Sequence, residues 1–373
     1  MSIERSVSGG TKAKVTKKFS IAAIPGDGIG SEVVPATIEV LHDLGEKCNI
    51  DFSFTHYDWG SEYYFKNHRM MPIDGLTLLK TADAILLGAV GHPSLADNVT
   101  ATGLMYPLRG GFDLFANVRP AVLYPGIECP LRGDRAIDMV IVRENTEGEY
   151  AQAGGLAHQG HGSEVAVQVA VFTRQGIERV IRFAFDLAAR RRKRLTLITK
   201  TNALGFGFGL WDRIFKEISS SYPNIETESL LVDAAALQFV RRPETFDVVV
   251  ASNLFGDILS DLAAAVTGSI GLAPSANIDP TRRFPSMFEP VHGSAPDIAG
   301  RGIANPLGAI LSAAMMLDHL GLPGPARTLE TAVRRVLEEG RVRTADIGGK
   351  STTREVIAEI REKIQTLDAV AAE

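Results

Sequence analysis

Strand-like and helix-like patterns alternate along this chain, and the alternation restricts the possible folds more than any other feature. Apolar runs typical of buried strands occupy residues 19–24, 50–57, 84–87, 139–142, 195–199 and 247–251. Helical patterns begin near residue 31, at 74–81 and at 174–189, and they fill most of the chain from residue 304. Helices that connect parallel strands cover the faces of the sheet. The chain is therefore predicted to be α/β, with a mostly parallel sheet and a site where strands end.

Length and composition are those of an ordinary globular protein. The 373 residues predict two domains, and the contents of 45% hydrophobic and 22% charged residues are typical. No apolar run reaches the roughly 18 residues that span a membrane, and the start does not resemble a signal peptide. The two cysteines, Cys48 and Cys129, are consistent with a reducing compartment. We expect a cytoplasmic protein with no membrane partner.

The distribution of charge argues against nucleic-acid binding. The formal net charge is -5, so we expect no nucleic-acid partner. The basic run Arg190–Arg194 lies between a helical pattern and an apolar strand, where we expect a solvated loop. Residues 1–18 are rich in Ser, Gly and Lys and are predicted to form a disordered tail.

Residues 250–262 contain a candidate metal site. An apolar run ends there, and Gly256 is expected to open a helix that carries Asp257 and Asp261. Residues four apart share a helix face, so the two carboxylates are predicted to project together. Mg²⁺ and Mn²⁺ take oxygen ligands from one or two carboxylates and leave positions for water and substrate. A solvated charged face is the alternative, although the apolar flanks place these acids beside a core.

Other strand ends carry glycines, arginines and proton donors. The turn Pro25–Gly30 could let backbone amides approach an anion or could be a tight structural turn, and it lacks the dinucleotide fingerprint. Arg109, Arg119 and Arg143 suggest a substrate with more than one carboxylate, because guanidinium groups pair with carboxylates bidentately; surface ion pairs are the alternative. The candidates for proton transfer are Tyr150 and Lys200.

Several segments, taken together and in order, carry a resemblance to a known family. They are residues 25–30, 117–120, 143–150, 200–202, 232–234, 256–261, 289–297 and 303–306. These segments resemble the β-decarboxylating dehydrogenases, whose members include 3-isopropylmalate, isocitrate, homoisocitrate, tartrate and D-malate dehydrogenases. The resemblance extends from residue 19 to about residue 360. It implies an isopropylmalate dehydrogenase-like two-domain fold, which is not a Rossmann fold. Domain 1, which binds the cofactor, would comprise 19–114 and 268–373, and domain 2, with the metal, the substrate and the dimer interface, would comprise 115–267.

The resemblance also implies roles for the substrate and metal residues. Arg109, Arg119 and Arg143 look like the arginines that hold the malate carboxylates. Asp257 and Asp261 look like the metal ligands of one subunit, for Mg²⁺ or Mn²⁺, with K⁺ as a candidate further ion.

Other residues resemble groups that act across a dimer. Asp233 matches the metal ligand that a partner subunit contributes. Lys200 also matches a residue that reaches across the dimer, where it serves as base toward the substrate hydroxyl. Tyr150 matches the acid that protonates the product enol, and Asn202 matches a contact to the nicotinamide. These matches imply a homodimer with shared active sites.

Cofactor choice depends on residues 292–305. Asp297 lies where NAD-dependent members have an acid that binds the adenosine ribose, and a carboxylate there would repel the 2′-phosphate of NADP. We therefore expect NAD. The remaining matches on the cofactor side are Glu289, His292, Gly293 and Asn305.

The segment before Arg109 bears on the substrate. From Gly103 to Arg109 the chain is one residue longer than the isopropylmalate pattern, although Leu104 and Met105 could still line an apolar pocket. Segments that look like the tartrate and D-malate branch are 57–64, 70–72, 147–150, 172–174 and 283–290. We expect D-malate or tartrate as substrate, with 3-isopropylmalate as the alternative. A non-catalytic binding protein is the rival from another class, and Asp297 argues against an NADP-linked isocitrate enzyme.

Overall fold

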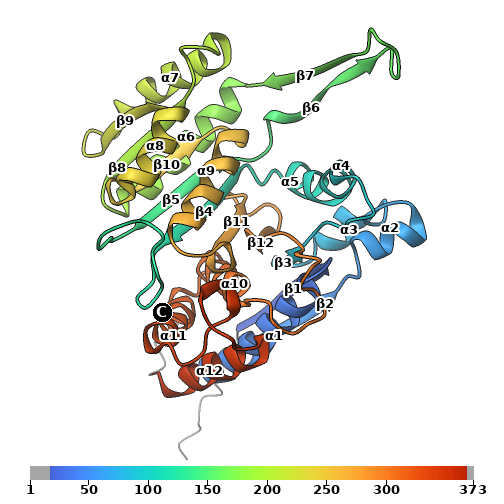
Figure 1. The fold of residues 1–373 in the computed structure, drawn as a ribbon, viewed down its shortest axis with the longest axis vertical. Helices are drawn as coiled ribbons and strands as arrows, with labels where there is room; N and C mark the ends of the chain where they lie inside the picture. The colour runs from blue at the N-terminus through green and yellow to red at the C-terminus, as the bar shows by residue number, and fades with distance from the viewer. Residues whose placement is uncertain (1–16, 368–373) are drawn as a thin grey trace, which may run out of the picture.

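A large sheet runs through the part of the chain that the computed structural model describes, residues 17–367 (Figure 1). Its ten strands lie in the order β2 (Ile50–His56), β1 (Lys17–Gly26), β3 (Ala84–Ala89), β12 (Ser286–Pro290), β11 (Pro274–Ile278), β4 (Ala116–Val122), β5 (Asp138–Glu144), β10 (Val248–Ala251), β8 (Arg194–Thr199) and β9 (Glu226–Leu231). Neighbouring strands are parallel toward both ends and antiparallel from β12 to β5 in the middle. The predicted α/β fold with a mostly parallel sheet is confirmed.

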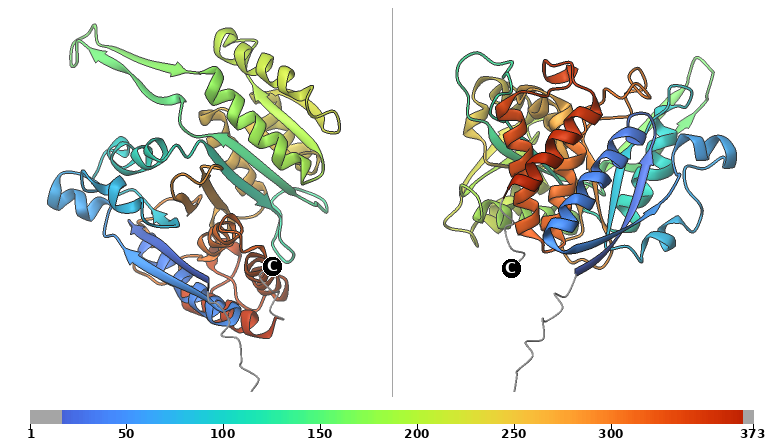
Figure 2. Two further views of the ribbon diagram at one scale, coloured as in Figure 1. Left: turned by 180° about the vertical axis from the view of Figure 1, so that it is seen from behind. Right: turned by 90° about the horizontal axis from the view of Figure 1, so that it is seen from below.

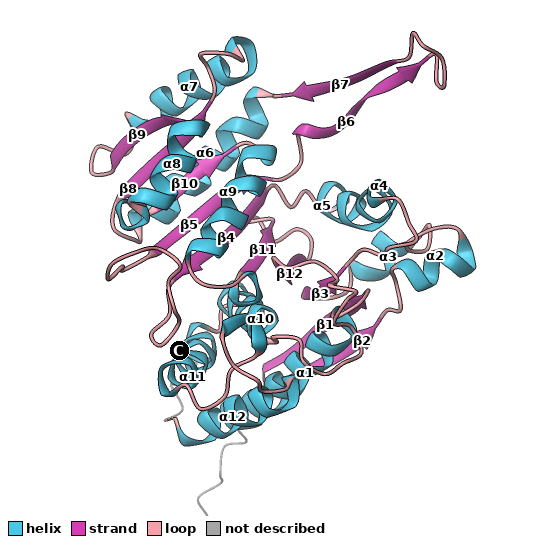
Figure 3. Ribbon diagram, viewed as in Figure 1, coloured by secondary structure: helices cyan, strands magenta, loops and turns pink. Residues whose placement is uncertain are grey.

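The long helices form two groups, one on each half of the sheet (Figures 2 and 3). The first group is α1 (Gly30–Cys48), α10 (Leu307–His319), α11 (Pro323–Glu339) and α12 (Thr353–Thr366). The second group is α6 (Arg174–Ala189), α7 (Gly205–Ser219), α8 (Val232–Arg241) and α9 (Asn253–Val266). The groups follow the predicted division of the chain near residues 114 and 268. Because one sheet continues through both halves, the division into two domains stays a prediction.

Shorter helical elements complete the structure. They are α2 (Ser61–Asn67), α3 (Gly75–Leu79), α4 (Asp97–Thr100), a π-helical turn at Ala101–Met105, α5 (Tyr106–Gly111) and 3-10 turns at Pro243–Thr245, Ile270–Leu272 and Ala345–Ile347. The elements α2 to α5 lie together at one side of the molecule, on the right in Figure 1.

Helix α6 shows how local sequence sets an element. Its start is capped by the Thr173 hydroxyl, which accepts a hydrogen bond from the Gly176 amide at 3.0 Å. Apolar residues with helical spacing, among them Ile177, Val180 and Ile181, are fully buried on the face toward the sheet. The helix spans residues 174–189 as predicted, because the cap and the apolar face agree on the same bounds.

Helix α9 begins earlier than predicted. Its first residue is Asn253, so Gly256 lies within the first turn and does not open the helix. A Cβ atom on Gly256 would lie 2.6 Å from Cβ of Arg143, which real side chains do not tolerate. The glycine is explained by this close approach of α9 to β5 rather than by a helix start.

The basic run agrees with the prediction only in part. The side chain of Arg191 pairs with the buried carboxylate of Asp247 at 2.8 Å and with Asp138 at 2.8 Å. Arg194 is the first residue of β8. Residues 190–193 do form a largely exposed loop, as expected, but Arg191 and Arg192 also hold this α6–β8 connection to the ends of β5 and β10. Of the predicted tail, residues 17 and 18 belong to β1, and 1–16 lie outside the described residues.

A two-stranded arm, β6 (Gly148–Ala157) and β7 (Val165–Val171), projects from the second half of the molecule (Figure 1). Val165, Val167 and Val169 on this arm are each more than 40% exposed. Within residues 17–367, no helix combines the length and the apolar character needed to cross a membrane.

Candidate active site

Three predicted arginines and a predicted metal ligand lie together where the halves of the sheet meet. Arg109 comes from α5, Arg119 from β4 and Arg143 from β5, and all three are buried. Arg143 lies opposite Asn117 in the β4–β5 register, two residues from Arg119, so both arginines are on the same face of the sheet. Asp257 on α9 covers this face and accepts hydrogen bonds from Arg119, at 3.2 Å, and from Arg143.

Arg143 is held by a residue that the sequence did not indicate. Its Nε and Nη2 atoms donate to Oδ1 of Asn253 at 2.9 and 2.7 Å. Burial, followed by the charge of Arg119, lowers the pKa of Arg143 to about 9, and Asp257 opposes this shift. Asn253 precedes Asp257 by four residues on α9, so the spacing that identified Asp257 and Asp261 could also have identified it.

A buried network supports Arg109 beneath the cleft. Glu289 accepts hydrogen bonds from Arg109 at 3.1 Å and from the Asn277 amide at 2.8 Å. Oδ1 of Asn277 in turn accepts from Asn117 at 3.0 Å and from Asn145 at 2.9 Å. Glu289 thus contacts Arg109, a predicted substrate-binding residue, and the contact of Glu289 with a cofactor stays a prediction. None of the three asparagines was predicted as a site residue; Asn117 and Asn277 lie in strands, where a single polar residue gives no sequence signal.

Asp257 and Asp261 form a donor set that suits a divalent cation. Both carboxylates approach Arg119, at 3.2 and 3.7 Å, and both are partly exposed. Although burial raises it, the charges of Arg143 and Arg119 hold the pKa of Asp257 below its usual range. Burial and the neighbouring Asp257 raise the pKa of Asp261, against the effect of Arg119. Two carboxylates side by side at a solvent-facing cleft fit Mg²⁺ or Mn²⁺, which would offset their repulsion.

Tyr150 lies at the base of the arm and faces the same cluster. Its hydroxyl donates to Oδ2 of Asp257 at 2.9 Å, and its ring lies 5.3 Å from the Arg143 guanidinium. Burial and the carboxylate of Asp257 raise the pKa of Tyr150 to about 12. The hydroxyl is therefore protonated at neutral pH and can act as a proton donor.

Lys200 and Asp233 form a separate pair. Nζ of Lys200, after β8, lies 2.7 Å from Oδ1 of Asp233 at the start of α8, and this contact lowers the pKa of Asp233. Asn202 is exposed in the following turn. Within the described residues no three His, Cys, Asp or Glu side chains are grouped to hold a metal, so Asp233 does not join Asp257 and Asp261 in one chain.

The glycine-rich turn after β1 is closed by backbone contacts. A Cβ atom on Gly28 would lie 2.0 Å from the carbonyl oxygen of Ser294, and one on Gly26 would lie 2.0 Å from that of Ala89. The Ile29 amide donates to the same Ser294 carbonyl at 2.8 Å. Of the two sequence interpretations, the contacts favour the tight structural turn, because the glycines are needed to let these chains approach.

Four of the predicted cofactor residues lie in the segment after β12, which contacts this turn through Ser294: His292, Gly293, Asp297 and Asn305. His292 is buried, burial lowers its pKa, and its Nε2 atom has no hydrogen-bond partner among the described residues. The space around Gly293 is open, and Asp297 is exposed. Asn305 donates to Asp346 at 2.9 Å. A buried ring nitrogen without a partner beside an open glycine fits a bound polar ligand such as a nucleotide.

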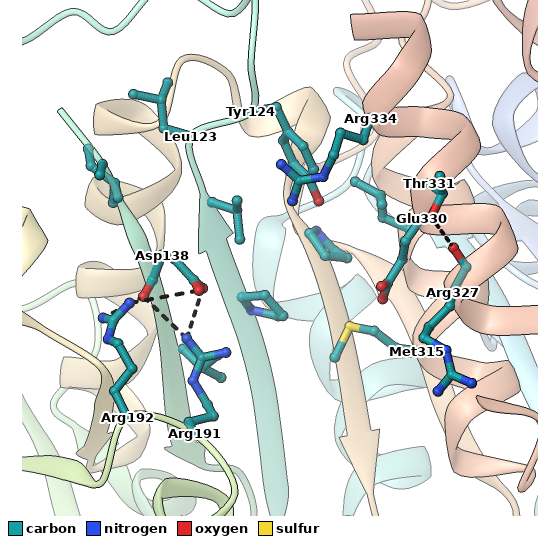
Figure 4. A pocket seen from close by; sticks show the side chains of 17 residues that line it. Leu123, Tyr124, Asp138, Arg191, Arg192, Met315, Arg327, Glu330, Thr331 and Arg334 are labelled. Carbon is teal, nitrogen blue, oxygen red and sulfur yellow. Dashed lines mark hydrogen bonds and ion pairs between the residues drawn. The ribbon is translucent and has the colours of Figure 1, made fainter. Parts of the chain in front are cut away.

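A cavity of about 650 Å³ lies elsewhere, between β5 and α11 (Figure 4). One wall carries Asp138 with Arg191 and Arg192, and the other carries Glu330 and Arg334. None of the predicted site residues lines it. The predicted substrate site is therefore separate from this cavity.

The family of the chain follows from comparison with known proteins. Residues 20–360 match the family model described as isocitrate/isopropylmalate dehydrogenase. The chain belongs to the isocitrate/isopropylmalate dehydrogenase family. This match confirms the predicted resemblance, the predicted fold and the prediction of a dehydrogenase that acts on a CH–OH group.

Relatives of this dehydrogenase cover nearly its whole length. A probable tartrate dehydrogenase/decarboxylase of Agrobacterium vitis is 52% identical over 353 residues, 93% of this chain and 98% of the relative. The D-malate dehydrogenase (decarboxylating) of Escherichia coli is 48% identical over 351 residues, 91% and 97% of the two chains. The crystal structure of isocitrate dehydrogenase from Methylococcus capsulatus has a TM-score of 0.86 at 39% identity and covers 93% of this chain and 100% of that one.

Proposed function

We propose that this dehydrogenase oxidises and decarboxylates a malate-class diacid, D-malate or tartrate, with NAD as oxidant. The observation that carries the proposal is the group of three buried arginines, two of which bond Asp257 beside Tyr150. Arginine binds carboxylates bidentately, so these guanidinium groups suit a substrate with two carboxylates. The choice of substrate class is supported by the relatives, which are named as tartrate and D-malate dehydrogenases.

Each of the proposed site residues has a separate role in the reaction. The arginines bind both carboxylates, and the partner subunit's Lys200 accepts the proton of the C2 hydroxyl. When bound, NAD accepts the C2 hydride and Mg²⁺ or Mn²⁺ offsets negative charge on the C2 oxygen. Loss of the C3 carboxylate as CO₂ leaves its electron pair in an enol, and Tyr150 then delivers a proton to C3. Before a substrate binds, Asp257 holds the Tyr150 hydroxyl beside the arginine cluster.

A homodimer with shared sites belongs to the same proposal. It is supported by the separation of the Lys200–Asp233 pair from the arginine cluster within one chain. It is also supported by exposed apolar residues on α8 and α9, Leu237, Val240 and Ile258, which a second copy would cover.

NAD specificity and location complete the proposal. Asp297 is exposed beside the open glycine, where its carboxylate would repel the 2′-phosphate of NADP. K⁺ is a further candidate ion. A cytoplasmic location is supported by Cys48 and Cys129, which are both free thiols.

The test is the initial rate of NADH formation by purified protein with Mn²⁺ and K⁺. D-Malate, L-tartrate, meso-tartrate and 3-isopropylmalate are compared by kcat/KM, with the Asp257→Asn variant as the inactive control. We expect D-malate or tartrate to lead by tenfold or more, which is about 1.4 kcal/mol of transition-state binding. A lead for 3-isopropylmalate contradicts the proposed substrate, and reduction of NADP in preference to NAD contradicts the proposed cofactor.

A further inference from the structure

The ring of Tyr106 stacks on the ring of Tyr150 across the cleft. The ring centroids are 6.0 Å apart, and the planes are inclined by 27°. Tyr106 is the first residue of α5, whereas Tyr150 belongs to β6, so the contact joins the two halves of the molecule (Figure 1). Because the Tyr150 hydroxyl donates to Asp257, the ring of Tyr106 borders the proposed reacting centre.

A π-helical turn presents Tyr106 to the cleft. The Tyr106 amide donates to the carbonyl of Ala101, five residues earlier, so the turn contains one residue more than an α-helical turn would. A π-helical turn is one way in which a helix accommodates an additional residue, such as the one noted between Gly103 and Arg109. A Cβ atom on Gly103 would lie 2.5 Å from Cγ of Met70, so the turn is packed closely against Met70. The direction of Tyr106 is thus set by packing.

The neighbouring apolar residues, Leu104 and Met105, pack on the core and not on Tyr150. Leu104 is fully buried in the cluster that contains Met70, and Met105 packs against the same cluster. The sequence had suggested that these two residues line the substrate pocket. Arg109 follows Tyr106 by three residues, so the two share a helix face toward the cleft. Tyr106 is therefore the side chain of this segment that lies between the carboxylate-binding Arg109 and the proton donor Tyr150.

We propose that Tyr106 is a specificity and positioning residue, whose ring closes the space beside C3 of the substrate and holds the ring of Tyr150. The inference rests on the proposed function, since it assumes a malate-class diacid bound at the arginine cluster. A hydrogen or hydroxyl on C3 leaves the stacked ring in place. An isopropyl group needs the volume that the ring occupies, so the stack disfavours the larger substrate.

The test compares D-malate and 3-isopropylmalate in the wild type and in the Tyr106→Ala and Tyr106→Phe variants. In Tyr106→Ala we expect kcat/KM for 3-isopropylmalate to rise relative to D-malate by about tenfold or more. We also expect a lower kcat with D-malate at little change in KM, because Tyr150 loses its support. Tyr106→Phe keeps the ring and should restore both values. Met105→Ala is the matched control, since it removes a side chain of the same segment that packs on the core.

The outcomes separate this inference from the proposed function. An unchanged substrate ratio in Tyr106→Ala, with thermal unfolding like that of the wild type, overturns the inference whichever diacid the wild type prefers. A wild-type preference for 3-isopropylmalate contradicts the proposed function instead. If Tyr106→Ala does not fold, Tyr106→Leu carries the same expectation. A wild type that neither turns over these diacids nor binds them in calorimetry with Mn²⁺ overturns both.

Discussion

Replacing Gly256 with alanine adds one methyl group where α9 passes closest to β5. In an open helix this change stabilises by about 1 kcal/mol, because alanine has the higher helix propensity. Here the added Cβ would lie 2.6 Å from Cβ and 2.8 Å from Cγ of Arg143. Overpacking of this kind costs about 1–3 kcal/mol, so we expect net destabilisation of about 0–2 kcal/mol. Since Asp257 is the next residue, a shift of α9 also moves the metal ligand.

Activity should be more sensitive than stability to this substitution. A displacement of about 1 Å can cost about 10²-fold in rate when reacting groups must be aligned. We expect kcat/KM for D-malate to fall by about that factor in Gly256→Ala. The matched control is Gly209→Ala in α7, where the nearest atom to the added Cβ is 3.8 Å away. The control should raise the midpoint of thermal unfolding and keep its activity. If Gly256→Ala behaves like the control, the close approach does not position Asp257 and the reasoning is refuted.

Three further predictions follow from named contacts. Asp297→Lys should raise the ratio of NADP to NAD use in steady-state kinetics, because the 2′-phosphate would meet a cation. Tyr150→Phe should lower kcat by about 10²-fold with little change in KM. Because the pKa of Tyr150 is raised to about 12, its hydroxyl stays protonated as pH rises, and the basic limb of the kcat profile should be the same in both proteins. Arg191→Met should lower the free energy of unfolding by about 2–3 kcal/mol, since buried Asp247 loses a charged partner.

Control variants and contrary results make these predictions decisive. Asp297→Asn removes the charge without adding a cation, and an unchanged cofactor ratio in Asp297→Lys would count against the NAD assignment. A Tyr150→Phe variant with wild-type kcat would exclude Tyr150 as the proton donor. Arg190→Met is the control for Arg191→Met, because within residues 17–367 the side chain of Arg190 hydrogen-bonds an exposed backbone carbonyl and no carboxylate, so the change in stability should be no more than about 0.5 kcal/mol.

Elements with one strong local pattern could be predicted from sequence, and others could not. The cap and apolar face of α6 gave its exact bounds, and the fully buried run of β10 was placed within one residue. The strands β4, β11 and β12 were not identified, because buried polar residues such as Asn117, Asn277 and Glu289 interrupt their apolar pattern. Those polar residues are satisfied by one another and by distant partners such as Arg109 and Ser275, and that network exists only after the strands pair.

The candidate site was predicted in part. The spacing of Asp257 and Asp261 placed both carboxylates on one helix face, and both approach Arg119. The stack of Tyr106 on Tyr150 was missed, because nothing in the sequence shows a π-helical turn. Leu104 was expected to line the substrate pocket, but its side chain is fully buried in the cluster that contains Met70.

The sequence by itself determined the alternation of strands and helices, the apolar faces of the long helices and the family resemblance. Each of these depends on residues within a few turns of one another or on motifs read in order. The tertiary structure alone decided which charges meet. Arg143 reaches Asn253 across 110 residues of chain, and Arg109 reaches Glu289 across 180. Burying a guanidinium is costly unless a partner is present, so the active cluster forms only when the halves of the sheet bring distant strands and helices together.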